Sequence, residues 1–224
     1  MSTGFDFDLR MPEPARDPFA RRKPTATLVV RSDSGVEEWR LPKRVARLLE
    51  SSLTSGEFEP MSRAELAYKV SELSRSAGHT RVAELLDKRD YASAELRQKL
   101  VDDGYSRKLS DELVSRAVEV GLVDDGRFAD VFVRSKVAAG WGRVKIEREL
   151  ARRGVSIDLL DGWPQDYLNH DSEFDNAYRL ASRRRITGKN DFQKIVRFLC
   201  GRGYPMGVSM DVAHKVLDER DEED

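Results

Sequence analysis

Apolar residues recur along the chain with two periods, that of a single helix and a longer one of about 50 residues. Ile146 and Leu150 lie four residues apart, which places both on one side of an α-helix. Gly154 follows where a left-handed residue closes a helix, and Val155 can fold back onto the last turn. Three glycines share this arrangement and are separated by 50 and 49 residues: Gly104, Gly154 and Gly203. This spacing indicates an internal repeat.

Each repeat is expected to contain three helices. One helix with apolar residues at i, i+3 and i+4 precedes each glycine-terminated helix, and another apolar stripe follows each glycine. The preceding residues are Val82, Leu85 and Leu86, then Phe128, Val131 and Phe132, then Phe174, Ala177 and Tyr178. The following stripes align Leu109 with Leu159 and Val208, Leu113 with Trp163 and Val212, and Val118 with Leu168 and Leu217. A unit of this size buries little by itself, so neighbouring repeats must stack.

The first 79 residues have a different pattern. Four prolines and mixed charges predict a disordered tail over residues 1–24. Alternating side chains around a Ser-Asp-Ser-Gly turn predict a hairpin, which a short helix and a linker follow, over residues 25–60. Ser62 and Glu65 form a capping box for a leading helix over residues 61–79, which Gly78 is expected to end. The repeats are then assigned to residues 80–123, 124–170 and 171–217, and an acidic tail to 218–224.

The predicted fold is therefore all-α: three tandem three-helix repeats in an elongated, curved array, with a small N-terminal hairpin and helix extension. Charged residues make up 35% and apolar residues 39% of the chain, as suits a soluble helical protein with a thin core. The longest apolar runs are shorter than a membrane span, and no secretion signal is expected. The one cysteine, Cys200, excludes an internal disulfide and is expected to be an ordinary half-buried thiol. We predict a cytoplasmic monomer.

The formal net charge of −1 conceals an uneven distribution of charge. Residues 127–205 contain 16 Lys and Arg against 10 Asp and Glu, whereas residues 206–224 contain two against seven. The basic residues concentrate on the predicted helix before Gly154, and at the end of the first helix of the third repeat and just beyond it: Arg143, Lys145, Arg148, Arg152, Arg153, Arg183, Arg184, Arg185 and Lys189. Such a concentration fits a contact surface for phosphates or for an acidic protein, and it also fits a solvated helix face.

No constellation for catalysis is recognised. The adjacent Asp124 and Asp125 precede an apolar helix, where Asp124 can cap the N-terminus. A metal site is the alternative for this pair, but no third ligand is placed to complete it. The histidines His79, His170 and His214 are scattered, and the repeat glycines end helices, whereas a phosphate-binding loop opens one. The chain is expected to be no enzyme and to use no metal or cofactor.

Three motifs in order resemble the RecX family, bacterial regulators of the RecA recombinase. The central signature comprises Leu122, Asp124, Asp125, Phe128 and Ala129. The block after it comprises Gly142, Ile146, Glu149, Leu150, Gly154 and Val155, and the block before it Tyr91, Glu95, Leu96, Lys99, Leu100 and Gly104. The resemblance covers residues 80–218. It implies tandem three-helix repeats in a curved molecule that binds the groove of the RecA–DNA filament and inhibits strand exchange, ATPase and coprotease activities.

Two features depart from the family pattern. Ala92 stands where the family usually has a capping serine, so Glu95 lacks its reciprocal partner and this helix is expected to start late or fray. The first 60 residues have no recognised counterpart.

Three functions are consistent with the sequence. The first is non-enzymatic regulation of the RecA filament, which would modulate recombination and the SOS response, with the basic residues as the contact to RecA or DNA. The second is sequence-tolerant DNA binding, because basic helix–Gly–helix pairs can imitate helix-turn-helix units. The third is a purely structural helical adaptor.

Overall fold

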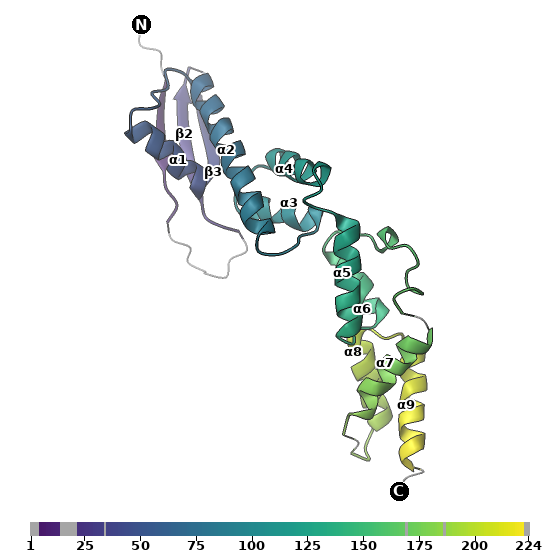
Figure 1. Cartoon of the computed structure of the whole chain (residues 1–224). Helices are drawn as coiled ribbons and strands as arrows, with labels where there is room; N and C mark the ends of the chain where they lie inside the picture. The colour runs from purple at the N-terminus through teal and green to yellow at the C-terminus, as the bar shows by residue number, and fades with distance from the viewer. Residues whose placement is uncertain (1–4, 14–21, 34, 169, 186, 222–224) are drawn as a thin grey trace. The chain divides into compact units, whose positions relative to one another are not determined.

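The computed structural model describes residues 5–13, 22–33, 35–168, 170–185 and 187–221. The chain divides into two compact units, residues 1–123 and 124–224 (Figure 1). The described part is mostly helical, but its N-terminal region forms a three-stranded antiparallel sheet. The all-α prediction is therefore corrected to a mostly helical fold with a small sheet. No helix in these ranges is both long and apolar enough to cross a membrane.

The first unit runs from the sheet into helices. Its elements are β1 (Asp6–Arg10), β2 (Thr25–Ser32), β3 (Gly35–Pro42), α1 (Lys43–Thr54), α2 (Arg63–Leu86), α3 (Ser93–Asp102) and α4 (Arg107–Glu119). The second unit is helical where it is described. Its elements are α5 (Asp125–Ala138), α6 (Arg143–Arg152), the 3₁₀ turn η1 (Ile157–Leu159), α7 (His170–Ser182), α8 (Asp191–Arg202) and α9 (Met206–Asp221).

The sheet contains a strand that the sequence analysis placed in a disordered tail. β1 pairs with β2, with Phe7 opposite Val30 and Leu9 opposite Leu28. Apolar and charged residues alternate from Phe5 to Met11, so one face of β1 packs against the core that α1 and α2 cover. The predicted hairpin is confirmed as β2 and β3. Residues 1–4 and 14–21 of the predicted tail lie outside the described residues.

Helix α2 continues through Gly78, so the predicted helix end at this glycine is wrong. A Cβ atom on Gly78 would lie 2.5 Å from Cδ1 of the buried Leu113 of α4. Glycine at this position permits close helix packing and does not close the helix. The predicted N-terminal cap is confirmed, because the Ser62 side chain accepts a hydrogen bond from the backbone N–H of Glu65.

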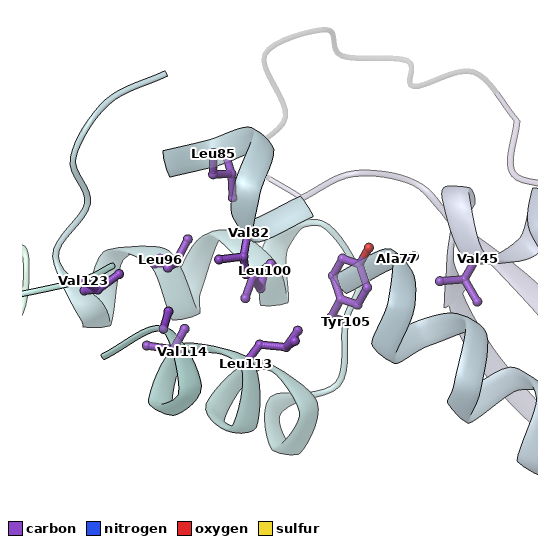
Figure 2. Packing of buried hydrophobic residues seen from close by; sticks show 11 residues of the cluster. Val45, Ala77, Val82, Leu85, Leu96, Leu100, Tyr105, Leu113, Val114 and Val123 are labelled. Carbon is purple, nitrogen blue, oxygen red and sulfur yellow. The ribbon is translucent and has the colours of Figure 1, made fainter. Parts of the chain in front are cut away.

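The core of the first repeat lies among α2, α3 and α4 (Figure 2). Leu96 and Leu100 are fully buried, and Tyr105, directly after Gly104, is buried beside them. Helix α3 begins at Ser93 with Ala92 as its N-cap residue, so the predicted late start is wrong. Glu95 pairs with Arg89, at 2.8 Å between Oε1 and Nη2. This ion pair gives the carboxylate a partner despite the missing serine. Val118, assigned to an apolar stripe, is exposed, and its neighbour Ala117 is buried instead.

A buried ion cluster attaches the start of β2 to the end of α3. The side chain of Asp103 is 4% exposed and lies 2.6 Å from Nε of Arg81 and 2.8 Å from Nζ of Lys23. The backbone N–H of Lys23 also donates to the carbonyl of Asp102. Burial raises the pKa of Asp103, but the neighbouring Lys23 and Arg81 cations outweigh it and hold the pKa below its ordinary value. Asp103 Oδ1 accepts no well-aligned hydrogen bond, and its stabilising partner is the positive charge of Lys23.

The second repeat departs from the predicted three helices. Its third segment forms only the turn η1. Beyond η1, Gly162 has a φ of 73°, outside the helical region, and Pro164 has no backbone N–H to donate within a helix. Leu159 is exposed, whereas the neighbouring Leu160 is buried. In α5, the predicted apolar residue Val131 is likewise exposed, and the buried residues are Ala129 and Val133.

The third repeat forms its own core from α7, α8 and α9. Ala177, Ile195, Leu199 and Val212 are its central buried residues. The predicted acidic tail begins inside a helix, because α9 continues through Asp218 to the last described residue, Asp221. Residues 222–224 of the predicted tail lie outside the described residues.

The three repeat glycines have the predicted backbone conformation. Their φ angles are 99°, 74° and 94° for Gly104, Gly154 and Gly203. An L-residue with a side chain is strained in this region, so glycine is the residue that closes these helices.

Candidate functional site

The predicted basic residues form two groups in the second unit. The α6 cluster comprises Arg143, Lys145, Arg148, Arg152 and Arg153. The α7–α8 cluster comprises Arg183, Arg184, Arg185 and Lys189, in the connection between those helices.

Burial of one side of α6 sets the direction of the α6 cluster. Ile146 and Leu150 are completely buried, one turn apart, and fix the helix against the unit. Arg148 and Arg152 lie on the solvent side and are exposed. Lys145, the third cation near this side of α6, is half-buried, so the α6 cluster is only partly exposed.

Aromatic rings lie beneath several of these cations, a feature that the sequence analysis did not identify. Lys145 Nζ lies 4.0 Å from the centroid of the Trp141 ring, and Lys136 Nζ lies 5.2 Å from the same ring. Phe132 faces both Lys136 and Arg153 at 5.2 Å. A four-residue spacing relates Phe132 to Lys136 and Trp141 to Lys145, and it is the signal that could have revealed these contacts.

Glu149 shares two arginines of the α6 cluster. Arg152 donates two hydrogen bonds to its carboxylate, at 2.8 and 2.6 Å, and Arg153 Nε donates a third at 3.2 Å. These bonds, that from Arg152 foremost, lower the pKa of Glu149 to about 2. Glu149 therefore stays ionised and partly neutralises this end of α6.

The N-terminus of α6 is tied to the third repeat. The backbone N–H groups of Gly142 and Val144 donate to the carbonyls of Arg202 and Gly203, at 3.0 and 3.1 Å. Arg143 Nε lies 3.7 Å from the buried carboxylate of Glu173 in α7. Arg143 thus neutralises an interior charge, which is a structural role.

The α7–α8 cluster follows the end of α7. Arg184 lies 4.3 Å from the centroid of the Phe198 ring, while Arg183, Arg185 and Lys189 are exposed. Beside them, burial opposes ionisation of Asp191, but hydrogen bonds from Lys194 and Thr187 lower its pKa to about 2.

The structure does not bring the two clusters together. Helix α6 meets α7 near Glu173, whereas Arg183 follows the other end of α7, about 15 Å further along at 1.5 Å per residue. Figure 1 shows the α7–α8 connection at the end of this unit away from α5 and α6. Four of the nine cations are exposed and make neither an ion pair nor an aromatic contact with any residue in the described ranges: Arg148, Arg183, Arg185 and Lys189. Arg184 is also exposed and makes no such ion pair, but it faces the Phe198 ring.

The acidic motif at the start of α5 is a helix cap. Asp124 Oδ1 accepts a hydrogen bond from the backbone N–H of Arg127 at 2.9 Å, as predicted. Asp125 is the first residue of the helix, where a carboxylate favours the positive end of the dipole. Phe128 stacks on Phe132 and Ala129 is fully buried. Within the described residues, no three His, Cys, Asp or Glu side chains gather into a group that could hold a metal ion.

The chain is similar in sequence to proteins of one known family. A family model described as RecX, second three-helix domain, matches residues 124–161, which span α5, α6 and η1. The regulatory protein RecX of Halorhodospira halophila is 34% identical over 145 residues, covering 62% of this chain and 86% of that protein. The regulatory protein RecX of Mycobacterium sp. (strain JLS) is 35% identical over 144 residues, covering 60% and 78%.

Two solved structures share the fold. A crystal structure of regulatory protein RecX has a TM-score of 0.57 at 14% identity and covers 95% of this chain and 99% of that one. RecX from Lactobacillus salivarius has a TM-score of 0.53 at 18% identity and covers 66% and 97%. The first match extends over most of the first 60 residues, for which no counterpart is recognised in the sequence.

These relatives are named as regulatory proteins, and this supports the prediction that the chain is not an enzyme. The matched region coincides with the helices that carry the signature, from Asp124 onward. Together with the identities above, this shows that the chain belongs to the RecX family of regulatory proteins.

Proposed function

We propose that this protein binds the RecA–DNA filament and inhibits its recombinase, ATPase and coprotease activities, and so modulates recombination and the SOS response. The observation that carries the proposal is the set of exposed, unpaired cations on a RecX-family chain: Arg148, Arg183, Arg185 and Lys189. A cation that has no partner in the described structure is free to meet a phosphate or an acidic protein side chain. Because that filament forms on chromosomal DNA, the proposal places the protein in the cytoplasm.

The separation of the two clusters suggests how the contact is made. Two separate basic groups on one unit fit a partner whose negative charges recur along its length, as phosphates do along DNA. The contact should weaken as salt rises, since screening limits exposed charges to about 8 Å at physiological ionic strength.

We further propose that the protein acts as a monomer and that its repeats stack into an elongated, curved array, with the domain boundaries expected from the sequence. Because each repeat in such an array contacts mainly its neighbours, the radius of gyration should exceed the roughly 17 Å of a compact globule of this length. Small-angle scattering of the full chain measures this radius directly. A value near that of a globule would exclude the array.

The test of function is RecA-dependent ATP hydrolysis on single-stranded DNA, titrated with this protein. The variant replaces the four unpaired cations with Glu: Arg148→Glu, Arg183→Glu, Arg185→Glu and Lys189→Glu. We expect inhibition to be lost at stoichiometric amounts, while thermal unfolding changes little, because exposed charges contribute within about 0.5 kcal/mol each.

A matched control reverses four exposed cations of the first unit: Arg47→Glu, Lys88→Glu, Arg107→Glu and Lys108→Glu. It changes the net charge by the same amount and should still inhibit. If the control variant loses inhibition and the first variant keeps it, the contact lies in the first unit and the proposed surface is wrong. Failure of the wild-type chain to inhibit would exclude the function itself.

Direct DNA binding is the second candidate, and the aromatic rings beneath the α6 cluster favour it. Single-stranded DNA is commonly bound by cations that contact the backbone together with aromatic rings on which bases stack. Trp141 and Phe132 lie within 5.2 Å of cations and are half-buried, so part of each ring is accessible. Binding of fluorescent single-stranded DNA without RecA distinguishes this candidate. Loss of binding in Trp141→Ala, with inhibition of RecA unchanged, would separate the two activities.

A further inference from the structure

A polar cavity lies in the first unit between the start of α1, helix α2 and the end of α3. Its volume is about 230 Å³, several times the roughly 30 Å³ that a water molecule occupies in the liquid, so it can hold the four oxygens of a phosphate. Its lining carries four cations and two carboxylates: Lys23, Lys43, Arg44, Arg81, Glu84 and Asp103. The walls therefore have a formal charge of +2, which suits an anion.

The two carboxylates do not engage all four cations. Arg81 and Lys23 contact Asp103, at 2.6 and 2.8 Å. The second carboxylate lies 2.5 Å from Arg44 Nη1. Lys43 is exposed and makes no ion pair with any residue that the structure describes. Its ammonium group is the cation left over for a ligand.

Helix α1 begins at this cavity without a cap. Pro42 is its N-cap residue, no side chain of the described structure accepts a hydrogen bond from its first-turn N–H groups, and that turn contains no acidic residue. Lys43 and Arg44 occupy the turn instead, where the positive end of the helix dipole disfavours cations. An anion bound here would accept hydrogen bonds from these N–H groups and offset both side chains.

A buried hydroxyl group lies at the same cavity. Tyr105 is 5% exposed, and its hydroxyl has no hydrogen-bond partner within the described ranges. Figure 2 shows this hydroxyl on the side of the ring away from Leu113. Burial raises the pKa of Tyr105, so the hydroxyl keeps its proton and can donate. The charged groups that also act on this pKa all line the cavity: Arg44, Asp103, Arg81 and Glu84. An enclosed hydroxyl without a partner costs free energy, and a bound anion would supply the acceptor.

We infer that this cavity binds a phosphate dianion, either free or as a monoester. Such a group carries close to two negative charges at pH 7, which match the formal charge of the walls. Its oxygens would accept from the first-turn N–H groups of α1, from Lys43 and from the Tyr105 hydroxyl. The inference goes beyond the contact with RecA, which is proposed for the second unit, and its test needs no RecA.

The experiment uses the full chain and inorganic phosphate as the probe. Isothermal titration calorimetry measures binding, and thermal unfolding at constant ionic strength measures the stabilisation that binding produces. We expect one phosphate per chain with a Kd of about 1 mM or tighter. The melting temperature should rise as the phosphate concentration exceeds this value.

Two variants separate a ligand site from a purely structural cluster. Tyr105→Phe removes only the hydroxyl and should weaken phosphate binding about tenfold, without lowering the melting temperature of the phosphate-free chain. Lys43→Glu places a carboxylate in the first turn of α1. It should raise the melting temperature of the phosphate-free chain and abolish the response to phosphate, because the helix then carries its own anion. Lys88→Glu, an exposed cation of the first unit outside the cavity, is the control and should bind phosphate as the wild type does.

Competition identifies the source of the phosphate group. The competitors are a short oligothymidylate with a 5′-phosphate and the same strand with a 5′-hydroxyl. Displacement of inorganic phosphate by the phosphorylated strand alone would make the end of a DNA strand the source. Displacement by neither strand would make the ligand free phosphate or a small phosphorylated molecule.

Three outcomes would overturn the inference. The first is no binding of phosphate to the wild-type chain at about 1 mM. The second is binding by Tyr105→Phe and Lys43→Glu that equals binding by the wild type. The third is equal competition by both strands, which would show that phosphodiesters, and not a dianion, occupy the cavity.

Discussion

Glycine is required at some positions of this chain and not at others, and substitution by alanine can distinguish the two kinds of position. Gly203 has a φ of 94°, and a Cβ atom there would overlap the backbone and Cβ of Lys145. Gly201 lies two residues earlier within α8, where a Cβ atom would meet nothing within 4 Å. The first position therefore requires glycine for both conformation and space, and the second does not.

We predict that Gly203→Ala destabilises the protein by about 2 kcal/mol or more, from left-handed strain and overlap together. Gly201→Ala should stabilise it by about 0.5–1 kcal/mol, because alanine favours a helix interior. Gly142→Ala tests overlap alone, since its φ of −82° is allowed but its Cβ would overlap the backbone of Gly203. Urea unfolding of the three variants measures the differences. Equal stability of Gly201→Ala and Gly203→Ala would contradict the assignment.

The buried carboxylate of Asp103 gives a second prediction for a single residue. Asp103→Asn removes the buried anion that Arg81, Lys23 and Lys99 share. It should cost about 3 kcal/mol, the low end for a broken buried ion pair, because Arg81 keeps Glu84. Glu119→Gln is the control, because the Arg116–Glu119 pair is exposed on both sides and its loss should cost little.

The pH dependence follows from the lowered pKa of Asp103. The unfolded chain binds a proton near the ordinary value of about 3.9, while the folded chain binds it only at lower pH. The stabilisation is therefore present above about pH 4 and lost as pH falls below that value. Unfolding free energies of wild type and Asp103→Asn should converge on acidification. A constant difference down to pH 2 would show that the charge is not the cause.

At the level of helices, the contact between α2 and α4 offers a double-mutant cycle. Gly78→Ala gains about 0.5–1 kcal/mol in helix propensity but forces Leu113 aside, at a typical cost of about 1–3 kcal/mol. We expect net destabilisation by about 1 kcal/mol in the wild type. In a Leu113→Ala background the same change should become stabilising, and the sign reversal is the measurement. Destabilisation in both backgrounds would show that Leu113 is not what limits this position.

Much of the element pattern could be predicted because it depends on local spacing. The positions of Ile146, Leu150 and the repeat glycines specify helices and their ends from neighbours within one turn. Strand β1 was missed because its alternation from Phe5 to Met11 is short and adjoins proline-rich sequence, and its partner β2 is distant in the chain. The continuation of α2 through Gly78 depends on Leu113 of another helix, which spacing along the sequence cannot reveal.

The candidate basic surface also depends on contacts that spacing along the sequence does not reveal. The sequence identifies nine cations, but only the structure distinguishes those that are paired from those that are exposed. Arg153 pairs with Glu149 at ordinary helical spacing. Arg143 pairs with Glu173, 30 residues away on another helix, which no spacing along the sequence signals.

For the whole molecule, each unit should be able to fold without the other. Residues 124–224 contain a complete cluster of buried residues in the third repeat and their own backbone bonds between Gly142 and Arg202. We predict that a fragment of residues 124–224 is helical by circular dichroism and unfolds in one cooperative thermal transition. A fragment of residues 1–123 is the counterpart. An unstructured 124–224 fragment would show that its core needs the first unit.

The ion pair between Lys23 and Asp103 also sets an order of events during synthesis. These residues are 80 positions apart, and β2 begins at Thr25, directly after the tie. At about 5–20 residues per second, the ribosome needs roughly 4–16 s to add the carboxylate after the lysine. Strand β2 is the central strand and packs against α1 and α2, but the segment just before it stays untied until Asp103 is made. A nascent chain arrested before residue 103 should remain open to proteases around Lys23, and one arrested well beyond it should resist cleavage there.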